Sequence, residues 1–419
     1  MSANIKIGLF GFGCVGQGLY DVLSNTKGIR ADIVKICVKH REKKRTLPPH
    51  HFTYDKYELL NNPEINVIVE LIDDVEEAYH IVKTALSSGK HVVSANKRML
   101  AYHIDELIEL QRQNNVSLLY EAAACGSIPI IRTLDGYYDN ELLNSVTGIF
   151  NGSSNYILSK VFNNQTSYDV ALKEAQDLGF AETDPTLDVA GFDALHKAVL
   201  LALHSYGVFV HPKEVLNLGI QNVSYEDIRY AREKELKIKL VANIKKTSEN
   251  KFAIYVLPQF VNQHHPLYEV ENEFNGVIVE AAFSDKQFFS GKGAGGHPTG
   301  SAVLSDISAL VYNYKYLYKK RTSENQLQFS KNVPIEIYVR YEEESDLAIF
   351  KFKEIIEKYS SGDYNYIIGE TTIEQLFKVK EQLAKSNLFV VVKERKVPSI
   401  SHSLLREKDE LITSISIKN

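Results

Sequence analysis

The chain has 419 residues, of which 44% are hydrophobic and 24% charged, with a formal net charge of -5 and a pI near 6.3. This composition is typical of a globular protein with two or three domains, and it excludes a protein that binds nucleic acid through a basic face. No apolar run approaches the roughly 20 residues of a membrane span, and no secretory leader precedes the first predicted strand. Three widely separated cysteines, Cys14, Cys37 and Cys125, suit a cytoplasmic protein.

The first third of the chain alternates between short apolar strands and amphipathic helices. Strands are predicted at residues 5–10, 33–38, 67–71, 91–94 and 117–120, and helices at 76–88 and 104–115. This alternation predicts a Rossmann-type α/β fold with a doubly wound parallel sheet. Ligands of such sheets bind beyond the carboxyl ends of the strands, so the loops at these ends form the candidate site.

The first predicted strand leads directly into a glycine-rich turn with the sequence Gly11-Phe12-Gly13-Cys14-Val15-Gly16, and a helical pattern follows. One glycine makes the tight turn, the next lets the backbone approach a pyrophosphate, and the third lets the helix pack on the strand. The helix N-terminus supplies unpaired N–H groups and a partial positive charge for the phosphates. Such turns also occur for structural reasons alone, but the position after the first strand favours a dinucleotide site.

The second predicted strand ends in ICVKHREKKR, where a site for NAD usually has a carboxylate for the ribose hydroxyl groups. Lys39 and Arg41 stand there instead, with Glu42 as the one acid among five basic residues. Basic side chains, and Arg above all, can pair with a 2′-phosphate. The pattern favours NADP(H) over NAD(H), while a solvated charged loop and the use of both cofactors stay open.

The sequence pattern changes near residue 142. Predicted strands at residues 146–150 and 253–256 and predicted helices at 170–178 and 195–206 indicate an α+β domain over residues 131–297. A glycine cluster, GKGAGGHPTG, then leads into a helix predicted at 301–312. We expect this helix to return to the first domain, which therefore comprises residues 1–130 and is completed by about 298–320.

Residues 326–395 form a third, small unit in this prediction, with the order strand, helix, strand, helix, strand. Its strands are predicted at residues 333–341, 364–369 and 388–393, and its second helix at 373–384. Such a βαβαβ unit is expected to be a separate regulatory or packing module. Residues 396–419 are polar and rich in serine, which predicts a poorly ordered tail.

Two lysines stand out by their positions. Lys97 follows the fourth predicted strand, so we expect it at the end of the sheet where a nicotinamide would lie. Lys197 follows Asp193 by four residues, which places carboxylate and ammonium group on one helix face. An ordinary surface pair explains this spacing equally well, but the apolar neighbours of Lys197 predict a buried helix. Burial lowers the pKa of a lysine and would suit proton exchange with an alcohol or carbonyl oxygen.

Several carboxylates lie just before Lys197. They are Glu182, Asp184, Asp188 and Asp193. Beside a lysine, such carboxylates can hold the ammonium group of an amino-acid substrate, cap helices or bind a divalent cation. The residues alone leave these three interpretations open.

Six motifs in this order resemble those of homoserine dehydrogenases and cover residues 5–306. They are GFGCVG, SANK, YEAAACGSIPII, GIFNGSSNYIL, AQDLGFAETDPTLDVAGFDALHK and GKGAGGHPTGSAVLSDI. The resemblance implies NAD(P)H-dependent reduction of L-aspartate 4-semialdehyde to L-homoserine, in threonine, methionine and isoleucine biosynthesis, by a homodimer formed through the second domain. The alternatives are another amino-acid semialdehyde dehydrogenase and a non-catalytic protein that senses NADP.

The resemblance also implies roles for single residues. Lys197 would donate the proton to the aldehyde oxygen, and Lys97 would act beside the nicotinamide as a second proton or charge partner. Glu182 and Asp193 would bind the substrate, supported by Asp188. The cofactor would be lined by residues 12–16, Ser94, Lys97, Gly179 and Gly295. A monovalent cation, usually sodium in the family, would be held by Glu121 and the backbone oxygens of Ala124, Gly126 and Ile128, although Glu121 is equally readable as a structural carboxylate at a strand end.

Three features depart from the family pattern. Asp73 and Asp74 stand where the family often has two glycines, and Cys125 stands where a glycine is common. The C-terminal unit is similar to the ACT regulatory domain of many relatives. It lacks the usual Asp-x-Pro-Gly turn after its first strand, which leaves threonine feedback an open question.

Overall fold

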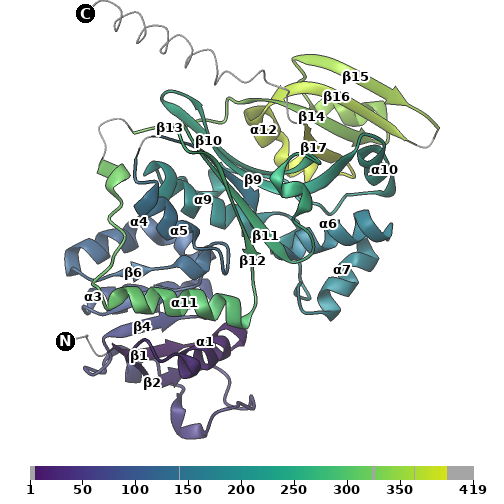
Figure 1. Ribbon diagram of the computed structural model, residues 1–419. Helices are drawn as coiled ribbons and strands as arrows, with labels where there is room; N and C mark the ends of the chain where they lie inside the picture. The colour runs from purple at the N-terminus through teal and green to yellow at the C-terminus, as the bar shows by residue number, and fades with distance from the viewer. Residues whose placement is uncertain (1–4, 141, 323–325, 363, 394–419) are drawn as a thin grey trace, which may run out of the picture.

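The computed structural model describes residues 5–140, 142–322, 326–362 and 364–393. In the first part of the chain, six parallel strands pair in the order β3-β2-β1-β4-β5-β6 (Figure 1). They are β1 (Ile5–Phe10), β2 (Ala31–Cys37), β3 (Phe52–Thr53), β4 (Val67–Glu70), β5 (His91–Ser94) and β6 (Leu118–Leu119). The strand order reverses between β1 and β4, and a dinucleotide crevice forms at the carboxyl ends of such a pair. The predicted Rossmann-type sheet is confirmed.

Helices connect these strands. They are α1 (Cys14–Asn25), α2 (Tyr57–Leu60), α3 (Val75–Ser87) and α4 (Lys97–Asn114). The chain moves from β1 to β2 in one direction and from β4 to β6 in the other, so right-handed crossovers place α1 on one face of the sheet and α3 and α4 on the opposite face.

A helix from much later in the chain, α11 (Gly296–Leu310), packs against α1 (Figure 1). The two backbones touch at glycines. A Cβ atom added to Gly18 would lie 2.1 Å from the carbonyl oxygen of Gly296, and one added to Gly300 would lie 2.6 Å from the backbone nitrogen of Leu19. Gly18 of α1 and Gly300 of α11 are therefore needed for the close approach of the two helices.

The start of α4 differs from the prediction. The apolar pattern indicated a helix from residue 104, whereas α4 begins at Lys97. Asn96 explains the earlier start because its side-chain oxygen accepts the backbone N–H of Met99 and caps the helix. Lys97 therefore projects from the first turn of a helix and not from a loop.

The second part of the chain builds a mixed sheet of eleven strands (Figure 1). Nine of them run in the order β12-β11-β7-β9-β10-β17-β14-β16-β15, and β8 and β13 also pair with β10. The strands before residue 300 are β7 (Leu143–Ile149), β8 (Leu216–Asn217), β9 (Leu236–Ser248), β10 (Lys251–Asn262), β11 (Phe274–Ala281) and β12 (Asp285–Lys292). The later ones are β13 (Gln328–Phe329), β14 (Pro334–Tyr341), β15 (Glu354–Ser360), β16 (Asn365–Thr372) and β17 (Phe389–Lys393).

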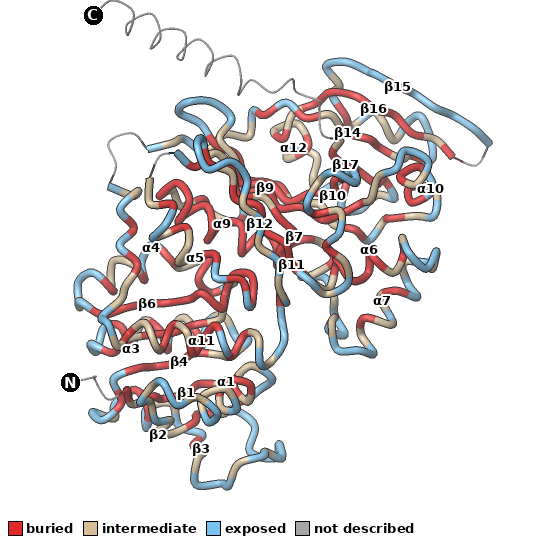
Figure 2. Tube along the Cα trace, in the orientation of Figure 1, coloured by how far each residue is buried: buried red, intermediate tan, exposed pale blue. Residues whose placement is uncertain are grey.

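Seven α-helices accompany this sheet in the described part of the chain. They are α5 (Ile130–Arg132), α6 (Gly152–Asn164), α7 (Tyr168–Asp177), α8 (Thr186–Val189), α9 (Phe192–Tyr206), α10 (Tyr225–Glu233) and α12 (Ile373–Leu383). Helix α9 is buried along almost its whole length (Figure 2). Because a buried helix is normally apolar all round, the buried Asp193, His196, Lys197 and His204 on α9 require partners inside the protein.

The C-terminal unit differs from the prediction in one element. The helix expected between its first two predicted strands is wrong, because that stretch forms a short 3-10 helix (Glu344–Ile349) and then the edge strand β15. Strand β15 shows no clean alternation of apolar and polar residues, so the sequence did not reveal it. The unit also shares a sheet with the preceding domain, since β17 pairs with β10; its role as a separate regulatory or packing module stays a prediction. The predicted tail at 396–419 lies outside the described residues.

A buried ion pair joins this unit to the preceding domain. Nε of Arg340, on β14, lies 3.0 Å from Oδ2 of Asp227, on α10, and the hydroxyl group of Tyr338 donates to Oδ1 of Asp227 at 2.8 Å. In the described part of the chain, no helix combines the length and the apolar character that a membrane span requires.

Candidate active site

One carboxylate, Asp193, bridges the two predicted lysines. Its Oδ2 lies 2.8 Å from Nζ of Lys197 on the same helix, and its Oδ1 lies 2.8 Å from Nζ of Lys97 at the start of α4. Lys97 lies on α4, in the domain built around the parallel sheet, and Asp193 lies on the buried helix α9 of the second domain. The structure therefore brings the three residues together where the two domains meet.

The backbone and one asparagine hold this cluster in place. Nζ of Lys197 donates to the carbonyl oxygen of Phe150 at 2.6 Å. Nδ2 of Asn151 donates to Oδ1 of Asp188 at 2.7 Å and to Oδ2 of Asp193 at 2.8 Å. Asn151 is not among the predicted site residues. It lies in the motif GIFNGSSNYIL, where an asparagine before a helix is a capping signal, and it does cap α6 by accepting the backbone N–H of Ser154.

The charges in the cluster act on one another. Burial opposes the ionisation of Asp193, but the ammonium groups of Lys197 and Lys97 outweigh it and hold the pKa of Asp193 well below its usual range. Burial, with the charge of Asp193 adding to it, raises the pKa of Asp188 to about 6. The charge of Asp193 in turn raises the pKa of Lys97. Asp193 is thus a permanent anion, and Asp188 titrates near neutral pH.

The glycine-rich turn borders a cavity of about 790 Å³ at the carboxyl ends of β1, β2 and β4. Gly11 has a φ of +91°, and a Cβ atom there would lie 2.5 Å from the carbonyl oxygen of Leu71, so only glycine fits. A Cβ atom added to Gly13 would meet nothing within 4 Å, which leaves open space over the turn. Cys14 follows at the exposed first position of α1, and Gly16 packs against Gly11. This cradle fits a pyrophosphate on a helix N-terminus.

The basic loop after β2 contributes to this cavity, but not through all of the predicted residues. Lys39, Lys43 and Arg45 line it, whereas the guanidinium group of Arg41 lies over the ring of Tyr54, 4.7 Å from the centroid. Four acidic residues line the cavity too: Asp55, Asp73, Asp74 and Glu77. Nζ of Lys39 lies 4.0 Å from Oδ2 of Asp74. In the described part of the chain, no Asp or Glu directly follows β2, which ends at Cys37.

The other predicted cofactor residues lie in different places. Ser94 ends β5, and its buried hydroxyl group donates to Glu70 at 2.6 Å. Gly295 precedes α11 with a φ of +118°, and the next residue, Gly296, lies against Cys14 of α1. The N-termini of α1 and α11 therefore meet beside the glycine-rich turn. Gly179, with a φ of +75°, lies in the turn after α7.

Glu182 is not drawn into the cluster in this structure. It is exposed on the loop between α7 and α8, and its backbone oxygen accepts the side-chain amide of Gln176 at 3.0 Å. Within the described residues, no hydrogen bond or ion pair joins its carboxylate to Lys97 or Lys197.

Comparison with known proteins identifies the family. The model of the homoserine dehydrogenase NAD binding domain matches residues 11–121, and the homoserine dehydrogenase model matches residues 129–308. The chain is 37% identical to homoserine dehydrogenase of Bacillus subtilis over 347 residues, which cover 80% of each chain. The chain belongs to the homoserine dehydrogenase family. It is therefore an NAD(P)-dependent oxidoreductase of amino-acid biosynthesis.

Further relatives and solved structures agree with this assignment. The Helicobacter pylori homoserine dehydrogenase is 39% identical over 314 residues, which cover 73% of this chain and 74% of the relative. The structure of a homoserine dehydrogenase from Thiobacillus denitrificans superimposes with a TM-score of 0.79 at 27% identity and covers 93% of this chain and 98% of that one. The S. aureus enzyme gives a TM-score of 0.70 at 30% identity, with 94% and 100% covered.

The residues predicted to hold a monovalent cation lie in the segment that precedes α5. Glu121 is buried, and its two carboxylate oxygens accept the backbone N–H groups of Ile131 at 2.7 Å and Arg132 at 2.9 Å. The carboxylate therefore satisfies backbone N–H groups of α5. This is the role expected of a structural carboxylate, the alternative that the sequence left open. In the described part of the chain, no cluster of three His, Cys, Asp or Glu side chains is arranged to hold a metal ion.

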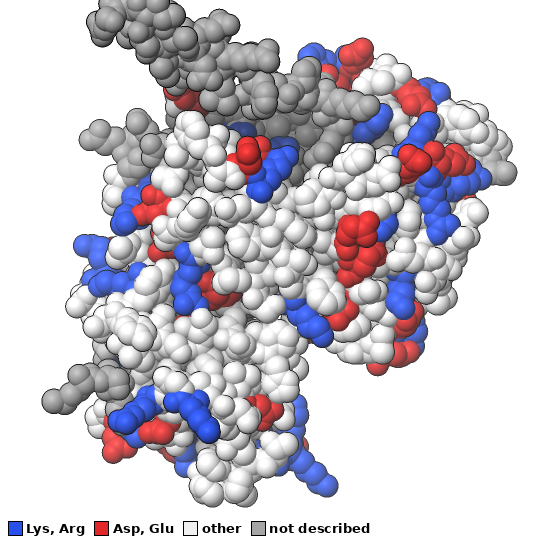
Figure 3. All heavy atoms as spheres, in the orientation of Figure 1, with Lys and Arg blue, Asp and Glu red and all other residues white. Residues whose placement is uncertain are grey.

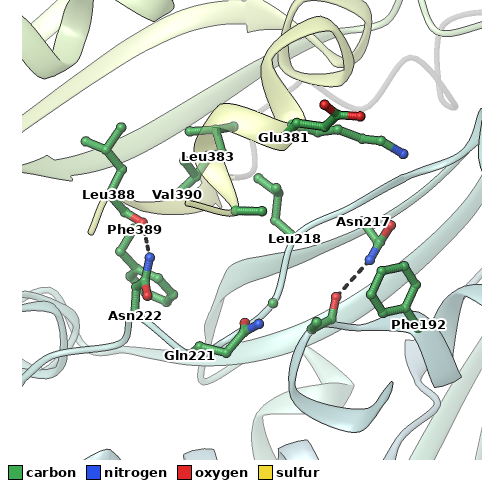
Figure 4. Close-up of a pocket in the computed structure, with 14 residues that line it drawn as sticks. Phe192, Asn217, Leu218, Gln221, Asn222, Glu381, Leu383, Leu388, Phe389 and Val390 are labelled. Atoms are coloured by element: carbon green, nitrogen blue, oxygen red, sulfur yellow. Dashed lines mark hydrogen bonds between the residues drawn. The ribbon is translucent and has the colours of Figure 1, made fainter. Parts of the chain in front are cut away.

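A second, smaller cavity of about 260 Å³ lies between the start of α9 and the C-terminal unit (Figure 4). Leu218, Leu383 and Leu388 form part of its wall. The side chain of Asn222 donates to the carbonyl oxygens of Ser386 at 2.8 Å and Leu388 at 2.9 Å and so ties the two sides together. None of the predicted site residues lines this cavity, although Phe192 precedes Asp193.

Proposed function

We propose that this chain reduces L-aspartate 4-semialdehyde to L-homoserine with NADPH and that Lys197 donates the proton to the aldehyde oxygen. The observation that carries the proposal is the bridge from Lys97 through Asp193 to Lys197 at the end of the nucleotide-binding sheet. The bound nicotinamide supplies the hydride. The side chains supply the proton and fix the geometry.

The environment of Lys197 suits a proton donor. An ammonium group has three N–H donors. The carbonyl oxygen of Phe150 and the carboxylate of Asp193 engage two of them, which leaves one for the substrate oxygen. Because Phe150 and Asp193 lie in the core, the direction of the third donor is set before the substrate arrives.

Lys97 and Asp188 complete the proposed site. Lys97 adds positive charge at the carboxyl end of the sheet, where negative charge develops on the reduced oxygen. Asp188 uses one oxygen to accept the amide of Asn151 and can offer the other to the substrate ammonium group. Both oxygens of Asp193 already face lysines, so Asp193 acts mainly by orienting them. Glu182 would need its loop to move before it could touch the substrate.

For the cofactor, we propose NADPH over NADH, lined by Gly11 to Gly16, Ser94, Lys97, Gly179 and Gly295. The support is the basic set Lys39, Lys43 and Arg45 around the cavity and the absence of a carboxylate directly after β2 in the described chain. A hyperthermophilic archaeal homoserine dehydrogenase mutant, 28% identical with a TM-score of 0.64, was solved in complex with NADPH. The packing of α11 on α1 supports a cofactor domain of residues 1–130 completed by 298–320.

A sodium ion and a homodimer also belong to the proposal. The proposed ligands of the ion are Glu121 and the backbone oxygens of Ala124, Gly126 and Ile128. The carboxylate of Glu121 already accepts two backbone N–H groups, and the oxygen of Ile128 accepts that of Ile130, so the ion would use their remaining lone pairs. For the dimer, the support is exposed phenylalanine on and beside β11 and β12, at Phe274, Phe283 and Phe288. In the view of Figure 3, the surface over these two strands carries few charged atoms.

The test is the absorbance at 340 nm of purified protein with NADPH and L-aspartate 4-semialdehyde, repeated with NADH. We expect a decrease that depends on the semialdehyde and is faster with NADPH. A folded protein that binds NADPH but does not oxidise it with any of the semialdehydes tested would contradict the proposal. That result would favour a non-catalytic protein that senses NADP. Turnover with a different amino-acid semialdehyde alone would assign another substrate.

A further inference from the structure

Glu70 is a buried carboxylate that the proposed mechanism does not use. It is the last residue of β4, at the carboxyl end of the sheet, and its exposed fraction is 0%. Its Oε2 accepts the hydroxyl group of Ser94 at 2.6 Å, and its Oε1 accepts the backbone N–H of Ile72 at 2.8 Å. A buried carboxylate is costly, so its place beneath the cofactor site requires an explanation.

The hydrogen bonds continue from Glu70 to the turn that carries Lys97. The hydroxyl oxygen of Ser94 accepts the backbone N–H of Asn96 at 3.1 Å. Nδ2 of Asn96 donates to the carbonyl oxygen of Ile72 at 3.0 Å, which joins the turn after β4 to the turn after β5. Asn96 also caps α4, and Lys97 is the first residue of that helix.

An ionised Glu70 satisfies every donor in this network. The hydroxyl group of Ser94 has one proton, which goes to Glu70, while its oxygen accepts from Asn96. Both contacts of Glu70 are therefore with donors. A protonated Glu70, or an amide in its place, would face one of these donors with a hydrogen of its own and leave a buried group unsatisfied.

We propose that Glu70 is a positioning residue: its carboxylate joins the turns after β4 and β5 through Ser94, Ile72 and Asn96 and so holds Lys97 against Asp193. The role rests on the proposed function, because it acts through Lys97 on the same reaction. Glu70 itself touches neither reactant.

The surroundings of Glu70 also make its effect depend on pH. Burial raises the pKa of Glu70 to about 7, the hydrogen bonds from Ser94 and Ile72 oppose this, and the nearby charge of Asp73 adds to it. The other charged groups close by are paired with one another: Asp74 faces Lys39, and Lys97 faces Asp193.

The signs for activity and stability are opposite. Above a pH of about 7 Glu70 is ionised, the network is complete, and Lys97 is held in place. As pH falls through this value the carboxylate takes up a proton and activity declines. For folding, a carboxyl pKa raised in the native state means that its ionisation destabilises the native state, so this contribution lowers stability as pH rises toward 7.

The decisive variant is Glu70→Gln, with the exposed Glu64→Gln as matched control. We expect Glu70→Gln to lower kcat by about 10- to 100-fold with a smaller change in the KM for NADPH, as for other supporting groups. Its kcat should also lack the decline below pH 7 that we expect for the wild type. Glu64→Gln should behave like the wild type. Ser94→Ala should reproduce much of the loss, and the double variant should be no worse than the worse single variant.

Two further measurements keep the inference falsifiable if Glu70→Gln folds poorly. Asp73→Asn should move the decline in kcat to lower pH, because it removes a charge that raises the pKa of Glu70. The Tm of the wild type minus the Tm of Glu70→Gln should be larger at pH 5.5 than at pH 8.

A wild type that is active, with Glu70→Gln unchanged in kcat and pH profile, would overturn the positioning role alone. An equal loss at every pH with the acid decline retained would also overturn it and leave a purely structural residue. A wild type that oxidises no NADPH with the semialdehyde would reject the proposed function and the positioning role together.

Discussion

The two sheets of this molecule differ in how far apart in sequence their paired strands lie. The parallel sheet is assembled by residues 5–119, in chain order apart from one reversal. The mixed sheet joins β7 to β9 and β11 and, across more than a hundred residues, β10 to β17. The first sheet presents its loops to the proposed cofactor site, and α9 of the second domain, which carries the proposed proton donor Lys197, packs against α4 of the first. The proposed chemistry therefore lies at the contact between a locally encoded region and one that depends on distant pairing.

The largest expected effect is on kcat and follows from changing Lys197, which lies where the two domains meet. Lys197→Ala should lower kcat by about 100- to 10,000-fold, because a positioned general acid contributes that much. The Kd for NADPH should stay near that of the wild type, since the cofactor cavity belongs to the first sheet. The rate at 340 nm and a fluorescence titration measure the two quantities. Lys173→Ala, which removes an exposed ion pair on α7, is the control and should change neither. Near-normal kcat in Lys197→Ala would rule out this lysine as the proton donor.

Arg340→Ala tests the continuity of the mixed sheet. Removing the guanidinium group leaves the buried carboxylate of Asp227 without its cation, and such losses cost about 3–5 kcal/mol. Urea unfolding measures the free energy of unfolding. Lys353→Ala, whose exposed amino group faces Glu370 in the same unit, should cost less than about 1 kcal/mol. A similar small loss for both variants would show that the C-terminal unit does not depend on this ion pair.

The pH dependence of the KM for the semialdehyde tests whether Asp188 binds the substrate. Its pKa is raised to about 6, so it is a carboxylate above that pH and neutral below it. Because only the carboxylate attracts the substrate ammonium group, the KM for the semialdehyde should rise as pH falls from 7 to 5, by about ten-fold per unit once the group is protonated. Asp188→Asn should have a high KM that no longer varies over this range. A wild-type KM that stays constant from pH 7 to 5 would count against this role.

The smallest expected effect concerns the cofactor alone. Lys43→Ala should lower the preference for NADPH over NADH by about 2- to 10-fold, in line with the loss of one partly exposed charge contact. The ratio of kcat/KM for the two cofactors measures it. Arg41→Ala is the informative comparison, because Arg41 lies over Tyr54 and does not line the cavity. A larger change in Arg41→Ala than in Lys43→Ala would support the sequence-based prediction that Arg41 binds the 2′-phosphate of NADPH.

What sequence reasoning predicted well is local in origin. Strands β1 and β5 were predicted with the bounds that the structure shows, because short apolar runs between turn signals identify buried parallel strands. The errors arose where local patterns were weak or misleading: the start of α4 depends on one capping asparagine, and β15 carries no alternation. Asn151 was missed as a site residue because a capping residue that also binds two carboxylates looks like any other cap.

The sequence by itself determined the glycine-rich turn, the parallel strands around it and the shared helix face of Asp193 and Lys197, since each depends on residues a few positions apart. Only the tertiary structure decided that Lys97 meets Asp193, that Asn151 joins Asp188 to them, and that β17 extends the sheet at β10. These contacts join elements far apart in the chain. Their partners are chosen by the packing of whole domains, which no local spacing records.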